Sequence, residues 1–230
     1  METHYILNIE TSTHICSVSL ALNGETVQLL ENTEDKTHAE LVSVYVEKVL
    51  EAENIKAPEL SAVAISAGPG SYTGLRIGTS VAKGICYGLN IPLIAIPSLY
   101  AMAYGAKNTL NKNALYCPFI DARRMEVYTA VYNAKLEVKK DTHALIVEKD
   151  SFNDLINDNT LVFFGTGAEK CKTILNHPNA IFLEEMHVSS RNMSKLAYQK
   201  FLSGHFKDTA YYEPLYLKEF LAIKSKKSLL

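Results

Sequence analysis

Apolar and polar positions near the start of the chain follow the two-residue period of β-strands. Residues 5–9 read as a buried strand that ends at Glu10, and residues 15–22 alternate, with Cys16, Val18, Leu20 and Leu22 on one face and Ser17 and Ser19 on the other. The pair Asn23-Gly24 is a strong signal for a two-residue hairpin, and residues 26–30 continue as a third strand. The pattern therefore predicts three strands joined as a meander at the beginning of the fold.

Helical periods follow this meander. Residues 37–40, Thr-His-Ala-Glu, match the capping-box pattern, and the helix that they open is expected to reach about Glu53. Its apolar residues cover more than one face, which indicates packing on the sheet and on a second surface as well. A strand at 62–65, a helix at 74–89, a strand at 91–96 and a helix from 97 to about 107 complete a β-β-β-α-β-α-β-α order.

The same order recurs in the second part of the chain. The expected strands are 114–120, 125–132, 138–147, 161–164 and 180–183, and the expected helices are 151–157, a segment from Gly165-Thr-Gly167 to about 176, and 192–202. A strand meander followed by alternating helices and strands, repeated once, is the plan of the α/β actin-like fold (ASKHA, ribonuclease H-like), a duplicated fold with two βββαβαβα halves. We therefore predict an N-terminal half at 1–108, a C-terminal half at 109–213 and a basic tail at 214–230.

The helix predicted at 74–89 contains an unusual amount of glycine. Each glycine in a helix costs about 1 kcal/mol of helix propensity relative to alanine, so close packing is expected to offset the cost. Gly74 and Gly78 fall beside the apolar face, where they would let the helix lie tightly on its sheet. Ser80, Gly84 and Gly88 form a second line of small residues, which leaves room for another helix from this chain or from a partner.

The turn before this helix has two interpretations. A strand, a glycine turn and a helix N-terminus form a scaffold that suits an anion, so the segment 68–71, Gly-Pro-Gly-Ser, is a candidate phosphate site. The spacing of its glycines fits neither G-x-G-x-x-G nor a P-loop, and Pro69 removes one amide. These departures favour a packing role for the turn.

Composition limits the classes of protein that fit. With 47% hydrophobic and 21% charged residues, and no apolar run long enough to span a membrane, the 230-residue chain is typical of a soluble globular protein. The first residues lack the pattern of a signal peptide and the four cysteines form no CxxC pair, so we expect a cytoplasmic protein without a zinc ribbon or disulfides. A net charge of −2 argues against a surface that binds nucleic acid directly.

Two acidic residues occupy equivalent places in the two predicted halves. Glu10 and Asp121 each end the first strand of a half, and in an actin-like fold the space between the halves holds a nucleotide. They could face each other and hold Mg²⁺, with Gly165 and Gly167 completing the candidate nucleotide cleft. The alternative is a hydrogen-bonded strand end and an Asx turn. The pair 123–124, Arg-Arg, fits either a hairpin or the cleft.

Four motifs resemble the TsaB family, in the order ILNIETST, AGPGSYTGLRIG, IPLIAIPSL and IDARRMEVY. They lie within residues 5–133, and a looser resemblance continues through GTGAEK to the segment 214–218, where the family's P-x-Y-L-R ends in Lys218. A lysine cannot reproduce a bidentate contact of that arginine. The resemblance implies an actin-like subunit that supports N6-threonylcarbamoylation of adenosine 37 in tRNA without catalysing it.

The resemblance also implies which partners and cofactors to expect. The TsaD-type transferase of that pathway carries an H-x-x-x-H metal motif where this chain has Ser98 and Met102, neither of them a suitable ligand for iron or zinc. No catalytic residue, metal or cofactor of its own is therefore expected, and ATP or ADP with Mg²⁺ only in the assembled complex. The expected partners are a TsaD-type transferase in a heterodimer, a TsaE-type ATPase in a larger complex, and a second copy when the chain is alone. Contact with tRNA is expected only through the complex, and none with a membrane.

The resemblance further implies that the two N-terminal helices mediate this pairing. The broad face of the helix at 38–53 and the second glycine line of the helix at 74–89 have the required features, and we expect a four-helix bundle with the partner. The residues expected at or near the contact are His38, Leu41, Tyr45, Arg76, Ser80, Lys83, Gly84 and Tyr87.

Two other classes of function remain open at this point. An ATP-dependent enzyme, a small kinase or ATPase acting alone, would use Glu10, Asp121 and the turn 165–167, but GTGAEK is only a partial phosphate-loop pattern. An RNA-binding module is disfavoured by the charge, although the lysines of the tail could assist the complex.

Overall fold

The computed structural model describes residues 2–33, 38–110 and 113–218. Its elements follow the order β1 (Tyr5–Glu10), β2 (Cys16–Leu22), β3 (Glu25–Asn32), α1 (His38–Ala52), β4 (Leu60–Ser66), α2 (Tyr72–Leu89), β5 (Leu93–Ile96), α3 (Ser98–Leu110), β6 (Leu115–Asp121), β7 (Glu126–Tyr132), β8 (Val138–Ile146), α4 (Asn153–Ile156), β9 (Leu161–Phe164), β10 (Ala180–Leu183) and α5 (Ser194–Leu202). Short 3₁₀ helices lie at Ala57–Glu59, Glu169–Cys171 and Ser190–Met193. Among the described residues, no helix combines the length and apolar character that a membrane crossing requires.

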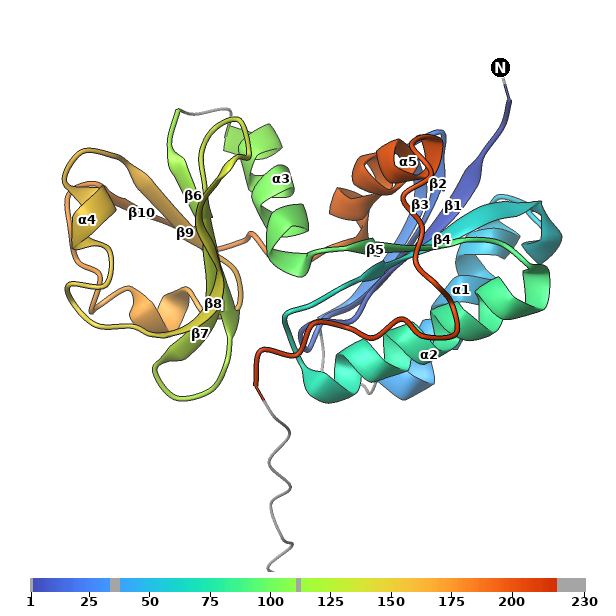
Figure 1. Cartoon of the computed structure of the whole chain (residues 1–230), viewed down its shortest axis with the longest axis horizontal. Coiled ribbons are helices and arrows are strands. Elements are labelled where there is room, and N and C mark those ends of the chain that lie inside the picture. Colours follow the sequence, from blue (N-terminus) through green and yellow to red (C-terminus); the bar gives the residue numbers. More distant parts are fainter. Residues whose placement is uncertain (1, 34–37, 111–112, 219–230) are drawn as a thin grey trace, which may run out of the picture.

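The strands form two five-stranded sheets of the same topology. The first has the order β3-β2-β1-β4-β5, and the second has the order β8-β7-β6-β9-β10. In each sheet the first three strands pair antiparallel and the last two join in parallel. The repeated order confirms the duplication that the sequence predicts, and Figure 1 shows the two sheets side by side.

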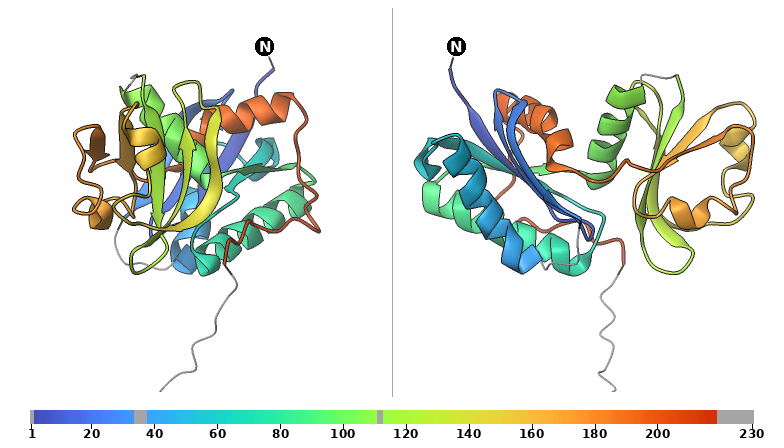
Figure 2. Two further views of the ribbon diagram at one scale, coloured as in Figure 1. Left: turned by 60° about the vertical axis from the view of Figure 1, so that its left-hand side comes forward. Right: turned by 180° about the vertical axis from the view of Figure 1, so that it is seen from behind.

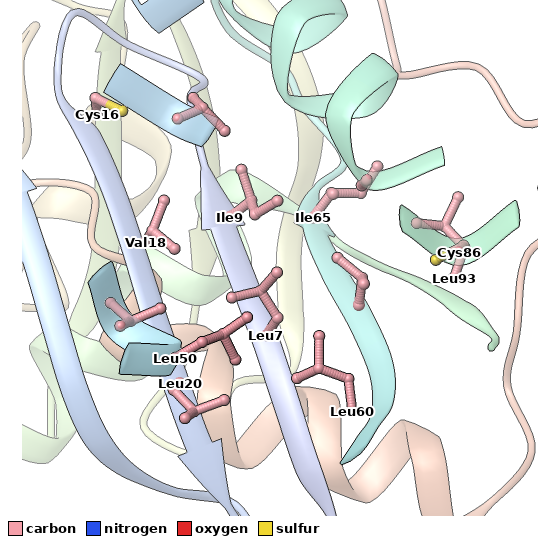
Figure 3. Close-up of a cluster of buried hydrophobic side chains, with 14 residues drawn as sticks. Leu7, Ile9, Cys16, Val18, Leu20, Leu50, Leu60, Ile65, Cys86 and Leu93 are labelled. Carbon is pink, nitrogen blue, oxygen red and sulfur yellow. The ribbon is translucent and has the colours of Figure 1, made fainter. Parts of the chain in front are cut away.

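The main core of the first half lies between its sheet and the helices α1 and α2. Figure 3 shows this cluster, in which Leu7, Val18 and Ile65 of the sheet meet Leu50 of α1 and Cys86 of α2. All five side chains are buried because α1 and α2 cover this face of the sheet. The core thereby fixes the positions of α1 and α2, whose outer surfaces face away from the sheet (Figure 2).

The last helix of each half covers the sheet of the other half. Helix α3, which follows β5, packs its residues Leu99 and Met102 in a cluster with β6 and β9 of the second sheet. Helix α5, which follows β10, packs Leu196 and Ala197 on Ile6 of the first sheet. The two halves are therefore joined by exchanged helices as well as by the chain itself (Figure 1).

This exchange explains a feature of β2 that the alternating pattern does not reveal. Ser17 and Ser19 are both fully buried, as are Cys16, Val18 and Leu20 on the opposite face of the strand. Ser17 Oγ lies 2.8 Å from Ser190 Oγ, and Asn8 of β1 donates to the hydroxyls of Ser19 and Ser194, 3.3 Å away in each case. A polar seam therefore joins the first sheet to the segment 190–194, which leads into α5.

One predicted helix is wrong. The segment from Gly165 to 176 contains only the 3₁₀ helix Glu169–Cys171 and turns, instead of an α-helix. Pro178 follows closely and disfavours helical backbone at the residue before it, and the chain between β9 and β10 is short. The capping box at 37–40 cannot be compared, since Thr37 lies outside the described residues.

Candidate functional site

The inner glycine line of α2 packs as the sequence predicts. A Cβ added to Gly74 would lie 2.2 Å from the carbonyl oxygen of Thr11, and one added to Gly78 would lie 2.3 Å from Thr11 Oγ1. Only glycine allows the helix to approach the connection after β1 this closely. The same contact brings in His38, whose Nε2 lies 2.7 Å from the carbonyl oxygen of Thr13. His38 therefore ties the start of α1 to that connection.

The second line of small residues on α2, which we call the outer line, makes no close contact that would explain its glycines within the described part of the chain. Ser80, Gly84 and Gly88 are exposed, and a Cβ added to Gly84 or Gly88 would meet no described atom within 4 Å. Each of these two glycines costs the helix about 1 kcal/mol, and no contact in the described part of the chain offsets it. The side chain of Tyr87, between them, is 87% exposed, which is unusual for a large aromatic residue.

The other predicted contact residues surround this line. Leu41 and Tyr45 of α1 are half-buried at the edge of the first core. Arg76 donates to the hydroxyl of Tyr72 at 2.8 Å and lies over its ring, and Lys83 donates to the carbonyl oxygen of Ala210 at 3.0 Å. We call the surface formed by Leu41, Tyr45, Arg76, Ser80, Lys83, Gly84 and Tyr87 the helix-pair face. The structure places all of them on two adjacent helices.

The two helices of this face carry opposite charges. Helix α1 exposes the carboxylates of Glu40, Glu47 and Glu51 against a single Lys48, whereas α2 has Arg76 and Lys83 and no acidic residue. A face with an acidic and a basic helix side by side is complementary to a similar face turned through a two-fold axis.

The turn before α2 is closely packed. A Cβ on Gly68 would lie 2.6 Å from the carbonyl oxygen of Leu215, and one on Gly70 would lie 2.1 Å from that of Ser12. The amide of Ser71 donates to Ser12 at 2.7 Å, while Ser71 Oγ accepts from Gly74 at 3.2 Å and caps the helix. These contacts favour the packing interpretation over a phosphate cradle.

Glu10 and Asp121 end β1 and β6, at the equivalent places that the sequence predicts, but their surroundings differ. Glu10 is 1% exposed and accepts from the amide of Ser12 at 2.6 Å. Burial raises its pKa from the ordinary value of 4.5, against the opposing effect of hydrogen bonds from Ser12 and Ser66.

Asp121, in contrast, is exposed. Its Oδ1 accepts from Lys170 Nζ at 2.5 Å and from the amide of Arg123 at 2.8 Å, as in an Asx turn. Arg123 and Arg124 are exposed in the hairpin between β6 and β7, where both have positive φ. The described residues include no group of three or more His, Cys, Asp or Glu arranged to hold a metal ion.

The glycines of the candidate cleft fit closely against β6. A Cβ on Gly165, which has φ +100°, would lie 2.6 Å from the carbonyl oxygen of Phe119. The amide of Gly167 donates to that same oxygen at 2.9 Å, so it is already paired. A cavity of about 820 Å³ lies elsewhere, between β3, α3 and the start of α5, and none of the four predicted cleft residues lines it. The nucleotide cleft remains a prediction.

Sequence reasoning missed the role of the segment that follows α5. Residues 207–218 return across the first half and along α2, where Ala210 meets Lys83 and the ring of Tyr216 lies 4.9 Å from that of Tyr72. The sequence did contain a sign of this packing in its closing pattern P-x-Y-L-K. Pro214 is conformationally restricted and Tyr216 is aromatic, and both lie in a segment that was predicted as a tail.

Comparisons of sequence and of structure with known proteins lead to the same group of proteins. The family model described as TsaD: tRNA N6-adenosine threonylcarbamoyltransferase matches residues 32–218. Proteins named tRNA threonylcarbamoyladenosine biosynthesis protein TsaB from Haemophilus influenzae and Escherichia coli are each 29% identical to the chain over 95% of its length, covering 95% and 96% of their own. A crystal structure described as a Pseudomonas aeruginosa protein with similarity to peptidase YEAZ is 23% identical, covers 94% of this chain and all of its own, and has a TM-score of 0.82, which shows the shared fold.

Proposed function

This chain belongs to the family of the TsaD model, tRNA N6-adenosine threonylcarbamoyltransferase, and from that membership we propose that it is a non-catalytic subunit that pairs with a TsaD-type transferase. Its relatives named TsaB support a part in tRNA threonylcarbamoyladenosine biosynthesis. In this proposal the chain supports modification of adenosine 37 by binding the transferase, and the transferase supplies the chemistry. A cytoplasmic location follows from the same role.

The outer glycine line of α2 is the observation that carries the proposal. A helix that keeps Gly84 and Gly88 exposed gives up about 2 kcal/mol of helix propensity in total relative to alanine. Small residues on a helix surface allow the backbone of a second helix to approach closely. Beside the line, Tyr87 supplies a large exposed aromatic side chain of the kind that dominates binding energy at interfaces.

The opposite charges of α1 and α2 support a particular arrangement. We propose that α1 of one subunit lies against α2 of the other, so that the carboxylates of α1 face Arg76 and Lys83 of the partner. Two helices from each subunit then form a four-helix bundle. A second copy of this chain can occupy the same face when the transferase is absent, and the heterodimer then replaces the homodimer. A TsaE-type ATPase and tRNA join only this larger complex.

The test is light scattering after size exclusion, on the chain alone and mixed with a TsaD-type transferase from the same organism. We expect a homodimer alone and a heterodimer in the mixture. Gly84→Arg fills the outer line with a long side chain and should weaken the heterodimer at least ten-fold, about 1.4 kcal/mol. Gln199→Arg, on the exposed side of α5, is the matched control and should bind as the wild type does. Wild-type affinity of the Gly84→Arg variant would contradict the proposal.

A further inference from the structure

The segment 207–218, which we call the strap, runs from the end of α5 back over the first half of the molecule. Figure 1 shows it passing β5 and then following α2 toward the second half. The amide of Lys207 donates to the carbonyl oxygen of Leu93 in β5 at 2.8 Å. Further along, Lys83 of α2 donates to the carbonyl oxygen of Ala210. The strap is therefore held at the sheet edge and on α2.

The middle of the strap is fixed in the turn between β4 and α2. Leu215 donates its amide to Ala67 at 2.8 Å, and its carbonyl oxygen occupies the space that a Cβ on Gly68 would need. Pro214 is buried, and the rings of Tyr216 and Tyr72 pack with centroids 4.9 Å apart. This part of the strap cannot shift without moving the start of α2.

The end of the strap contacts the other half. Lys218 forms an ion pair with the carboxylate of Glu126, the first residue of β7, and its Nζ lies 3.5 Å from the carbonyl oxygen of Ala122. The same ammonium lies 5.9 Å from the ring centroid of Tyr128. Lys218 thus makes three contacts with one hairpin of the second sheet, although it belongs to a segment fixed on the first half.

The halves are otherwise connected through the chain crossings that lead into α3 and α5 and through contacts of α3 itself, where Ala101 joins the cluster around Ile6 and Gly105 lies against Asn192. The crossings and helix α3 lie together between the two sheets, away from the end of the strap (Figures 1 and 2). Two rigid bodies joined at one place can rotate about that place, and the residues in such crossings absorb the rotation. A contact on a separate side of the joint limits the rotation.

We propose that the strap is a latch, in which the pair Lys218–Glu126 holds the two halves at a fixed angle. The device is independent of whether a partner occupies the helix-pair face. The side chains of Lys218 and Glu126 are 39% and 24% exposed, so water weakens the pair. Its loss should raise the population of more open arrangements roughly five-fold, a change equal to about 1 kcal/mol.

The test measures the distance between the halves by pulsed electron paramagnetic resonance. Spin labels on Ala57→Cys in the first half and Asp158→Cys in the second report the angle, since both positions are exposed. The natural cysteines are buried, so the introduced ones should react preferentially. Lys218→Glu and Glu126→Lys are each compared with the double variant Lys218→Glu/Glu126→Lys, which reverses the pair and restores its attraction.

The latch predicts a broader distance distribution with a new component in both single variants, and a return to the wild-type distribution in the double variant. The matched control is Lys172→Glu, which breaks an ion pair of 2.8 Å with Glu184 inside the second half and should leave the distance unchanged. A wild-type distribution in the single variants overturns the proposal. So does a double variant as broad as the singles, because the attraction of the pair would then not be the cause.

Discussion

Alanine substitutions along α2 should separate glycines that serve the fold of the chain from glycines that do not. Gly74, Gly78 and Gly84 occupy one helix, so each replacement gains the same intrinsic helix propensity, about 1 kcal/mol. What differs is the space for the added methyl group. Because the gain in helix propensity is the same at all three positions, differences in the free energy of unfolding among the variants measure how far the added methyl group clashes with its neighbours.

The structure assigns a different outcome to each position. At Gly84 the methyl group meets no described atom within 4 Å, so the chain should gain about 1 kcal/mol, or roughly 2–4 °C in melting temperature. At Gly74 the methyl group would lie 2.2 Å from a backbone oxygen of Thr11, which cannot rotate away. Overpacking of about 3 kcal/mol less the propensity gain leaves a net loss of roughly 2 kcal/mol. At Gly78 the obstacle is Thr11 Oγ1, which moves only if χ1 of this buried, β-branched side chain changes, so a net loss of about 1 kcal/mol is expected.

Urea unfolding of the wild type and the three variants, followed by circular dichroism, gives the free energies. Each protein should be unfolded at two concentrations, because association of the native state raises the apparent stability. The order Gly84→Ala, Gly78→Ala, Gly74→Ala from most to least stable is the expected result. A destabilised Gly84→Ala at the lower concentration would refute the reasoning, since it would mean that the outer line already packs within the single chain.

Three further outcomes follow from buried groups. Burial raises the pKa of Glu10, so the folded state binds the proton more tightly than the unfolded state does. In urea titrations the wild type should therefore lose stability relative to Glu10→Gln as pH rises above about 4.5. Parallel pH profiles of the two proteins would contradict this expectation. Asn8→Ala removes an amide that donates to Ser194 and should cost about 1–3 kcal/mol by the same assay, whereas a change near zero would show that the polar seam contributes little. Burial raises the pKa of Cys16 and of Cys86 to about 11 each. Ellman's reagent at pH 8 should therefore react slowly with the native protein and rapidly after denaturation. A thiol that reacts rapidly in the native protein would contradict the burial.

Much of this fold could be predicted because its local signals are strong. The hairpin at Asn23-Gly24 forms with positive φ at both residues, as its turn type requires. Alternation and apolar runs located the strands, and the glycine spacing of α2 separated an inner line from an outer one before any contact was known. The positions of Glu10 and Asp121 at equivalent strand ends also followed from element order alone.

The rest depended on contacts between distant parts of the chain. Whether Ser17 faces water or another element depends on Ser190, and no local pattern records their meeting. Likewise the environments of Glu10 and Asp121 differ although their positions correspond, because Glu10 is buried whereas Asp121 is exposed and pairs with Lys170. The helix predicted after Gly167 was wrong for a different reason. The segment between β9 and β10 is short, and it forms a 3₁₀ helix and turns instead of an α-helix.

The exchange of α3 and α5 between the halves has a consequence for biosynthesis of the chain. Synthesis proceeds from the N-terminus, so the first sheet emerges long before the helix that covers its second face. The second face of this sheet includes Ile6, Ala62 and Ile94. These residues can pack against Leu196 and Ala197 only when nearly the whole chain has been synthesised. During that interval only α3, through Ala101, can cover part of this apolar face, and exposed apolar surface of this kind favours aggregation. A message truncated after the first half would release a product that keeps this face exposed and aggregates.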